Sequence, residues 1–187
     1  MEISMEYTSF SKLGRLIYGP AHMGQESVSS LTVHGPAVLS GTEVTEKTEI
    51  NGTLEANKAS LNHLTVNGSM TGKDVRLFSG RVSGAADLER VTARGTLIIY
   101  GYLKAVDCEF KERVIIDSVE SSFISCKVFQ IVIQDSSSSF TKQTIYLKDK
   151  CRIYNSITFL SGKGEIIATA DSDIEEKQVT GGKIIRV

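Results

Sequence analysis

The sequence contains no tryptophan, two prolines, three cysteines and no long uninterrupted apolar run. A helix that crosses a membrane needs roughly 20 consecutive apolar residues, so the sequence excludes a membrane-spanning helix. The first residues, MEISMEYTSFSKLGRLIYG, lack a charged start followed by an apolar stretch and predict no signal peptide. We expect a cytoplasmic protein, with membrane association as an option. A secreted or periplasmic domain whose leader has been removed is the alternative.

An excess of charge of one sign is also lacking, since 21 Lys and Arg residues face 22 Asp and Glu residues. No basic footprint is present, and nucleic acid is not an expected partner. P-loop, dinucleotide-binding and G-x-S-x-G motifs are absent. We therefore expect no catalytic and no cofactor-binding residues. The alternative is an enzyme that acts on carbohydrate or acyl substrates.

The sequence does contain an internal repeat. One apolar series advances in steps of 17, 16, 16, 17, 17, 17 and 20 residues: Val33, Ile50, Val66, Val82, Ile99, Ile116, Ile133 and Ile153. Two places after the first members stand Gly35, Gly52, Gly68, Gly84 and Gly101. A second series keeps the same period: Ala59, Val75, Val91, Cys108 and Cys126. Such a period is the signature of a solenoid.

Within each period, apolar and polar residues alternate over short runs such as Leu64-Thr65-Val66, as they do in strands. Strands this short bury their apolar row only by stacking on the equivalent strand of the next turn. The sequence therefore predicts an all-β, single-domain parallel β-helix with turns of 16–17 residues. The alternative is a left-handed hexapeptide coil, whose strict six-residue period the uneven spacing does not follow.

We divide the chain into an N-terminal cap or tail (1–29), the β-helix (30–160) and an irregular last turn with a closing strand (161–187). In the first segment, Phe10, Leu13, Leu16 and Ile17 have helical spacing. They predict a small capping helix, or a helix that binds a partner or a membrane surface. The stretch DSSSSFT at 135–141 predicts a loop that leaves the coil.

Several polar residues share a phase of the repeat. Asp74, Arg90 and Asp107 predict an outward row of salt-bridged side chains, and Asn51 and Asn67 predict a short ladder at one corner. Cys108 and Cys126 are expected to stack as buried thiols, in an unassigned redox state. Cys151 is expected to be buried in another column, near Val114 and Ile131. The three histidines, His22, His34 and His63, lie at unrelated phases, so we expect no metal site.

The V-x-G, G-x-L-x-A and L-x-V-N-G elements between about residues 30 and 135 resemble those of the bactofilins, bacterial cytoskeletal proteins that form polymers. The resemblance implies a right-handed triangular coil, end-to-end assembly without nucleotide, and frequent attachment to the inner membrane. The glycine column stops after Gly101, which departs from the family pattern and argues against polymerisation more than against the coil.

We therefore predict a non-enzymatic scaffold that self-associates through its terminal rungs, because unpaired strand edges recruit further strands. The residues expected at the contact are Leu31 and Val33 at one end and Ile184, Ile185 and Val187 at the other. The alternative function is a surface-exposed β-helix that binds a glycan or a protein partner through a lateral face.

Overall fold

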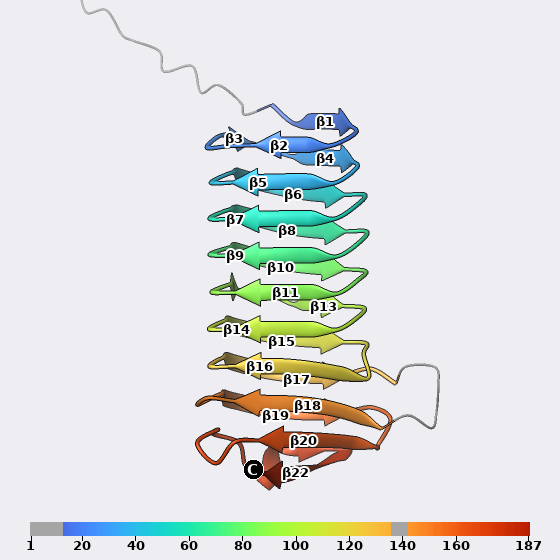
Figure 1. Ribbon diagram of the computed structural model, residues 1–187, viewed down its shortest axis with the longest axis vertical. Helices are drawn as coiled ribbons and strands as arrows, with labels where there is room; N and C mark the ends of the chain where they lie inside the picture. Colours follow the sequence, from blue (N-terminus) through green and yellow to red (C-terminus); the bar gives the residue numbers. More distant parts are fainter. Residues whose placement is uncertain (1–12, 136–141) are drawn as a thin grey trace, which may run out of the picture.

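The computed structural model describes residues 13–135 and 142–187, and these form a single parallel β-solenoid (Figure 1). Its turns stack along one axis, and each strand pairs in parallel with the equivalent strands of the neighbouring turns. The described residues contain no α-helix, only the short 3-10 helix η1 (Glu176–Gln178). The predicted all-β, single-domain solenoid is confirmed.

The strands form two sheets that wrap around a common core. The ten-stranded sheet consists of β2 (Ala21–Met23), β5 (Ala37–Ser40), β7 (Leu54–Asn57), β9 (Met70–Lys73), β11 (Ala86–Glu89), β14 (Leu103–Val106), β16 (Glu120–Ile124), β18 (Gln143–Lys148), β20 (Gly164–Ala168) and β22 (Gly182–Arg186).

The twelve-stranded sheet bends at a corner within each turn. It consists of β1 (Arg15–Tyr18), β3 (Ser27–Val28), β4 (Leu31–His34), β6 (Glu43–Ile50), β8 (Ser60–Val66), β10 (Arg76–Val82), β12 (Thr92–Ala93), β13 (Leu97–Ile99), β15 (Glu109–Ile116), β17 (Lys127–Ile133), β19 (Arg152–Phe159) and β21 (Val179–Thr180).

The coil is right-handed. In Figure 1 the near strands of the ten-stranded sheet run to the left, the far strands run to the right, and the chain descends from β1 to β22. This is the hand that connections between parallel strands almost always take, because strands themselves twist to the right.

The core consists of columns of apolar side chains, one member from each turn. Val33, Ile50, Val66 and Val82 stand in register, and each is fully buried. The alternation of apolar and polar residues follows because successive side chains in a strand point to opposite faces. Each buried side chain therefore packs on its equivalents in the turns before and after it.

The end of this column differs from the prediction. Ile133 pairs with Phe159, whereas Ile153 pairs with Val128 in the neighbouring column. The insertion between Ile133 and its equivalent in the next turn is therefore longer than the step of 20 residues in the sequence series suggested. Most of the predicted loop at 135–141 lies outside the described residues.

The recurring V-x-G element is explained by the corner that follows the buried valine. A Cβ atom added to Gly52 would lie 2.5 Å from the carbonyl oxygen of Gly35 in the preceding turn. For each glycine of this column, the added atom would lie no more than 2.9 Å from the backbone one turn earlier: Gly35, Gly52, Gly68, Gly84 and Gly101. The backbones stack too closely for any side chain there.

The boundary predicted at residue 30 is corrected by the strands that precede it. Strands β1, β2 and β3 pair in register with β4, β5 and β6, so the coil includes the described residues from Arg15 on. The helix predicted from apolar spacing is wrong for Leu16 and Ile17, which lie in β1, while Phe10 lies outside the described residues. Ile17 packs against the core in register with Val33, so it is the first member of the buried column that Val33 belongs to. This burial favours a strand over a helix.

We predict that Gly52→Ala lowers the free energy of unfolding by about 2 kcal/mol, because the added methyl group clashes with backbone that cannot move aside. Gly24→Ala is the matched control, since its added Cβ would have no neighbour within 4 Å. Urea unfolding followed by circular dichroism measures both variants. Equal stability of the two would contradict the steric explanation.

Thr48 interrupts an apolar column between Leu31 and Leu64. Its side chain is fully buried, and its hydroxyl has no hydrogen-bond partner among the described residues. Burying an unpaired hydroxyl costs free energy that a methyl group of the same shape does not. Thr48→Val should therefore raise the free energy of unfolding by about 1 kcal/mol. A destabilised Thr48→Val protein would show that the hydroxyl is satisfied in solution.

Candidate functional site

The N-terminal end of the coil presents open strand edges. Within the described part of the chain, β1 pairs only with β4, β2 only with β5, and β3 only with β6. The other edge of each strand therefore carries backbone N–H and C=O groups without a sheet partner. Such edges are templates for the addition of another strand.

Apolar side chains accompany this N-terminal edge. Leu16 and Tyr18 in β1 are 58% and 78% exposed, and Leu13 just before the strand is 80% exposed. The ring of Tyr18 stacks on His34 of the next turn, with ring centroids 5.0 Å apart. This end of the coil therefore combines unpaired backbone with exposed apolar surface, as an interface does.

The C-terminal end also has open edges, since β21 pairs only with β19 and β22 only with β20 within the described residues, but its side chains differ. Arg186 occupies the place in the last turn that Ala168 holds one turn earlier, in a column that faces the core. Its guanidinium donates hydrogen bonds to the carbonyl oxygens of Thr169, Ser172 and Ile174. A charged residue at an inward position of a terminal strand is a device that blocks further strand addition.

A second polar side chain closes the same end. Gln178 of η1 donates hydrogen bonds through its Nε2 to the carbonyl oxygens of Ile153 and Asn155. Strand β21, which follows η1, is only two residues long. The twelve-stranded sheet therefore ends in a short strand whose neighbouring carbonyl groups are already paired.

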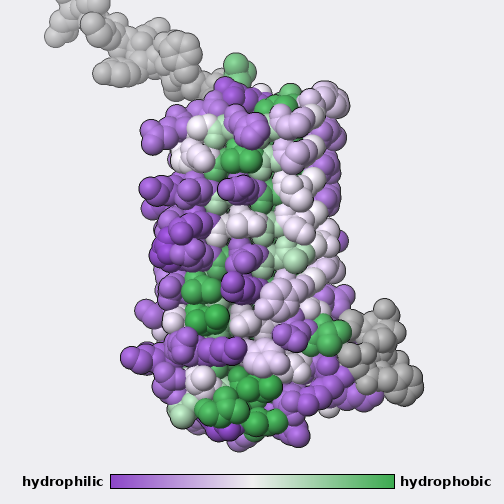
Figure 2. All heavy atoms as spheres, in the orientation of Figure 1, coloured by the Kyte–Doolittle hydropathy of each residue, from purple (hydrophilic) through white to green (hydrophobic). Residues whose placement is uncertain are grey.

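The residues predicted to mediate self-association fall into two groups. Leu31 and Val33 are fully buried in β4, which pairs on both sides, so the structure corrects their placement on the terminal rung. Ile184 and Ile185 lie in the last strand, β22, and Val187 follows it, 69% exposed. Ile184 packs against the core, whereas Ile185 stands outward beside Ile167. Figure 2 shows apolar side chains gathered in this region, over β20 and β22.

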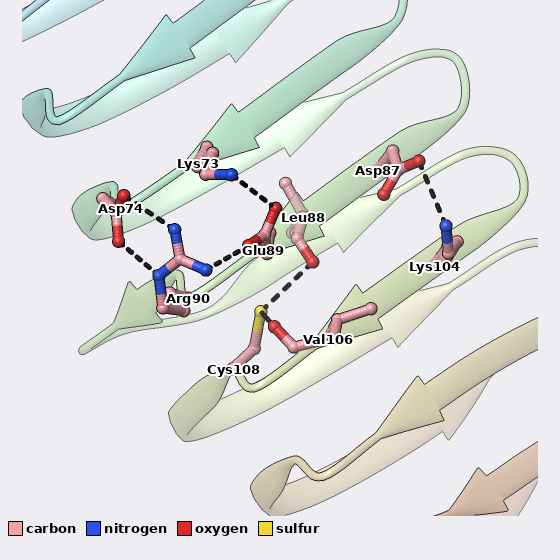
Figure 3. A network of polar contacts seen from close by, with 9 residues as sticks. All are labelled: Lys73, Asp74, Asp87, Leu88, Glu89, Arg90, Lys104, Val106 and Cys108. Carbon is pink, nitrogen blue, oxygen red and sulfur yellow. Dashed lines mark hydrogen bonds and ion pairs between the residues drawn. The ribbon is translucent and has the colours of Figure 1, made fainter.

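The expected outward row of charged residues is present in part at a second corner: Asp74 and Arg90 pair, whereas Asp107 is exposed and forms no ion pair with any described residue. Arg90 binds both carboxylate oxygens of Asp74 at 2.6 and 2.9 Å and also pairs with Glu89, which Lys73 approaches at 3.2 Å (Figure 3). The Arg90 guanidinium holds the pKa of the Asp74 carboxyl below its usual range. These groups are solvent-exposed and mutually neutralising, so they form a structural surface rather than a reactive site.

The predicted Asn ladder also forms, since Asn67 donates a hydrogen bond of 2.7 Å to Oδ1 of Asn51. The ladder extends one turn further, because Nδ2 of Asn51 lies 3.2 Å from Nδ1 of His34. With Tyr18 stacked on His34, polar and aromatic side chains line this corner up to the N-terminal edge.

The cysteines form one column rather than the two expected. Cys108, Cys126 and Cys151 are free, buried and in register on successive turns, so the placement of Cys151 near Val114 and Ile131 is corrected. The loop insertion before Cys151 hid its phase from the sequence pattern. The backbone N–H of Cys126 contacts Sγ of Cys151 at 3.4 Å, and Sγ of Cys151 donates to the carbonyl of Phe123.

The environment of Cys126 and Cys151 disfavours the thiolate form, whereas a hydrogen bond with Cys126 lowers the pKa of Cys108. Hydrogen bonding to Cys108 together with burial raises the pKa of Cys126 to about 12. Hydrogen bonding to Cys126 and burial also raise the pKa of Cys151. All three thiols are buried, so the cysteine column fills part of the core.

Residues 13–135 and 142–187 contain no group of three or more His, Cys, Asp or Glu side chains placed to hold a metal ion. No helix of the described chain is long and apolar enough to cross a membrane. No protein-family model, no curated protein and no solved structure matches this chain.

We predict that a thiol reagent such as dithionitrobenzoate labels the folded protein far more slowly than the unfolded chain at pH 7. A thiol with a pKa of about 12 is ionised in only about one molecule in 100,000 at that pH, and burial excludes the reagent as well. The number of thiols labelled before and after addition of guanidinium chloride provides the measurement. Rapid labelling of any cysteine in the native state contradicts the prediction.

Proposed function

We propose that the protein is a structural scaffold that self-associates through the N-terminal end of its coil. The observation that carries this proposal is the open edge of β1, β2 and β3, with Leu16 and Tyr18 exposed beside it. Pairing this edge with a second copy satisfies backbone groups and removes apolar surface from water in a single step.

The difference between the two ends favours a closed assembly. Head-to-tail stacking would place Arg186 of one copy against the apolar start of the next, and burying its guanidinium there costs free energy. Contact between two N-terminal ends avoids this cost. Because the same surface then meets itself across a two-fold axis, the product is a dimer and not a filament.

The resemblance to bactofilins supports a scaffold role through the repeat length and the V-x-G corners, and bears less on the assembly mode. A scaffold that closes into dimers holds two coils end to end as a rod, whose lateral faces carry any further partners. Membrane attachment through an amphipathic N-terminal helix receives no support from residues 15–18, which form strand.

We predict that the double variant Leu16→Lys/Tyr18→Lys weakens self-association at least tenfold, because like charges then meet across the two-fold contact. The matched control is Phe129→Lys/Tyr154→Lys, which adds the same charges to side chains 40% and 54% exposed on a lateral face. Analytical ultracentrifugation over a range of concentrations measures the dimer dissociation constant of each protein. Circular dichroism verifies that each variant is folded.

A wild-type protein that sediments as a monomer at concentrations well above micromolar would refute the self-association proposal. Filaments in negative-stain electron microscopy would instead refute the closed dimer and restore head-to-tail stacking. An equal loss of association in the control variant would move the contact to a lateral face.

A further inference from the structure

A shallow recess of about 460 Å³ lies on the outer surface of the twelve-stranded sheet and begins at β6, which pairs with the edge strand β3. It crosses the successive turns that contain β6, β8, β10, β12 and β15. Buried Leu61 and Leu77 form part of its floor. The side chains that give the recess its chemical character are Asn62, Arg76, Phe78, Arg94 and Lys111.

The recess exists because the turns differ in length. In β8 and in β10, two residues lie between the two inward-facing positions that flank the bend of the twelve-stranded sheet. In the turn before, three residues lie between the equivalent positions of β6. In the turn after, three residues lie between the equivalent positions of β12 and β13. The two 16-residue turns therefore have short corners between the longer corners of 17-residue turns. The longer corners border the depression.

The recess carries unbalanced positive charge. Arg76, Arg94 and Lys111 lie on three successive turns, about 4.8 Å apart along the axis. Arg76 and Arg94 form no ion pair with any described residue, and Lys111 lies 3.6 Å from Glu109. Glu43 is the acidic residue among those that line the recess, and it lies at the opposite end from Lys111. By contrast, Arg90 at the neighbouring corner is fully paired.

Phe78 is a fixed aromatic platform within this charged surface. It is 50% exposed, and its ring meets the edge of His63 in the preceding turn, with centroids 5.3 Å apart and planes at 75°. His63 is itself held by a contact of 2.8 Å between Nδ1 and Oγ of Ser79. In the following turn, Gly95 lies against the ring, since an added Cβ would lie 3.5 Å from Cε1 of Phe78.

We propose that this recess binds a linear acidic polysaccharide of uronic acid units, with the sugar chain running along the axis of the coil. Arginine side chains bind carboxylates in a bidentate manner, and the recess has two on neighbouring turns, with Arg94 two residues beyond Thr92, the partner of Arg76. The face of a sugar ring packs on an aromatic ring. Nδ2 of Asn62 donates to the carbonyl oxygen of Thr45, and Oδ1 of Asn62 and the hydroxyl group of Thr92 provide hydrogen bonds for sugar hydroxyls.

The alternatives fit the recess less well. A nucleic acid needs more phosphate contacts than three cations supply, and the net charge of −1 provides no long-range attraction. A densely sulfated glycan carries more negative charge per unit than this row neutralises. One carboxylate per sugar matches one cation per turn. The proposal is independent of self-association, because the recess lies on the outer face of the sheet, whereas the proposed contact is the edge of β1, β2 and β3.

The test measures binding of hexagalacturonate by isothermal titration calorimetry at low salt. We expect saturable binding that weakens as salt is added. Arg76→Gln/Arg94→Gln should raise the dissociation constant at least tenfold. Phe78→Ala should raise it severalfold without a change in charge, whereas Phe78→Tyr should retain binding. Lys104→Gln/Lys148→Gln is the matched control, since it removes two cations from the ten-stranded sheet.

Three results would overturn the proposal. The first is the absence of binding by the folded wild-type protein at millimolar hexagalacturonate. The second is equal weakening by the recess variant and the control, which would indicate general charge attraction. The third is tighter binding of oligo-thymidylate, polyglutamate or a sulfated oligosaccharide at the same residues, which would replace the uronate by another ligand class. Neutral maltohexaose should not compete.

Discussion

The structure depends on the in-register stacking of one turn on the next. Each strand has parallel neighbours at the equivalent positions of the turns before and after it, so its backbone hydrogen bonds lie between turns. The same register places like side chains on like, which produces the valine, glycine and cysteine columns. A side chain at a tight corner must therefore fit against its own equivalent one turn away. Where the backbones come closest, only glycine fits.

This constraint also explains where the molecule can interact. Inside the coil, backbone and core are satisfied by the adjacent turns, so unpaired groups remain at the ends. The last strands, β21 and β22, have a single neighbour each, as the first strands do, but the side chains at the two ends differ. Arg186 and Gln178 pair with carbonyl groups at the C-terminal end, while β1 presents an open edge with apolar side chains at the other. This asymmetry is the basis of the proposed closed end-to-end contact.

The shape of the lateral surface depends on small differences in length between successive turns. The difference between turns of 16 and 17 residues is taken up at the bend of the twelve-stranded sheet, where it changes the surface without disturbing the core. A one-residue difference thus hollows the surface beside Phe78 and leaves Arg76 and Arg94 exposed. The regular interior and the irregular exterior are separable in this fold, since a solenoid turn contacts only its neighbours.

The sequence by itself determined the period, the strands and the identity of most core residues, because stacking repeats the same local requirements in each turn. It also predicted the Asp74–Arg90 pair and the Asn51–Asn67 ladder, which depend only on phase. Tertiary structure decided the rest. Leu16 and Ile17 are compatible with helix or strand, and only docking on β4 selects the strand. Cys151 and Phe159 follow an insertion that breaks the count, so three-dimensional pairing alone assigns their columns. The closed end formed by Arg186 and the recess around Phe78 likewise arise from contacts between separate turns, which a linear pattern does not contain.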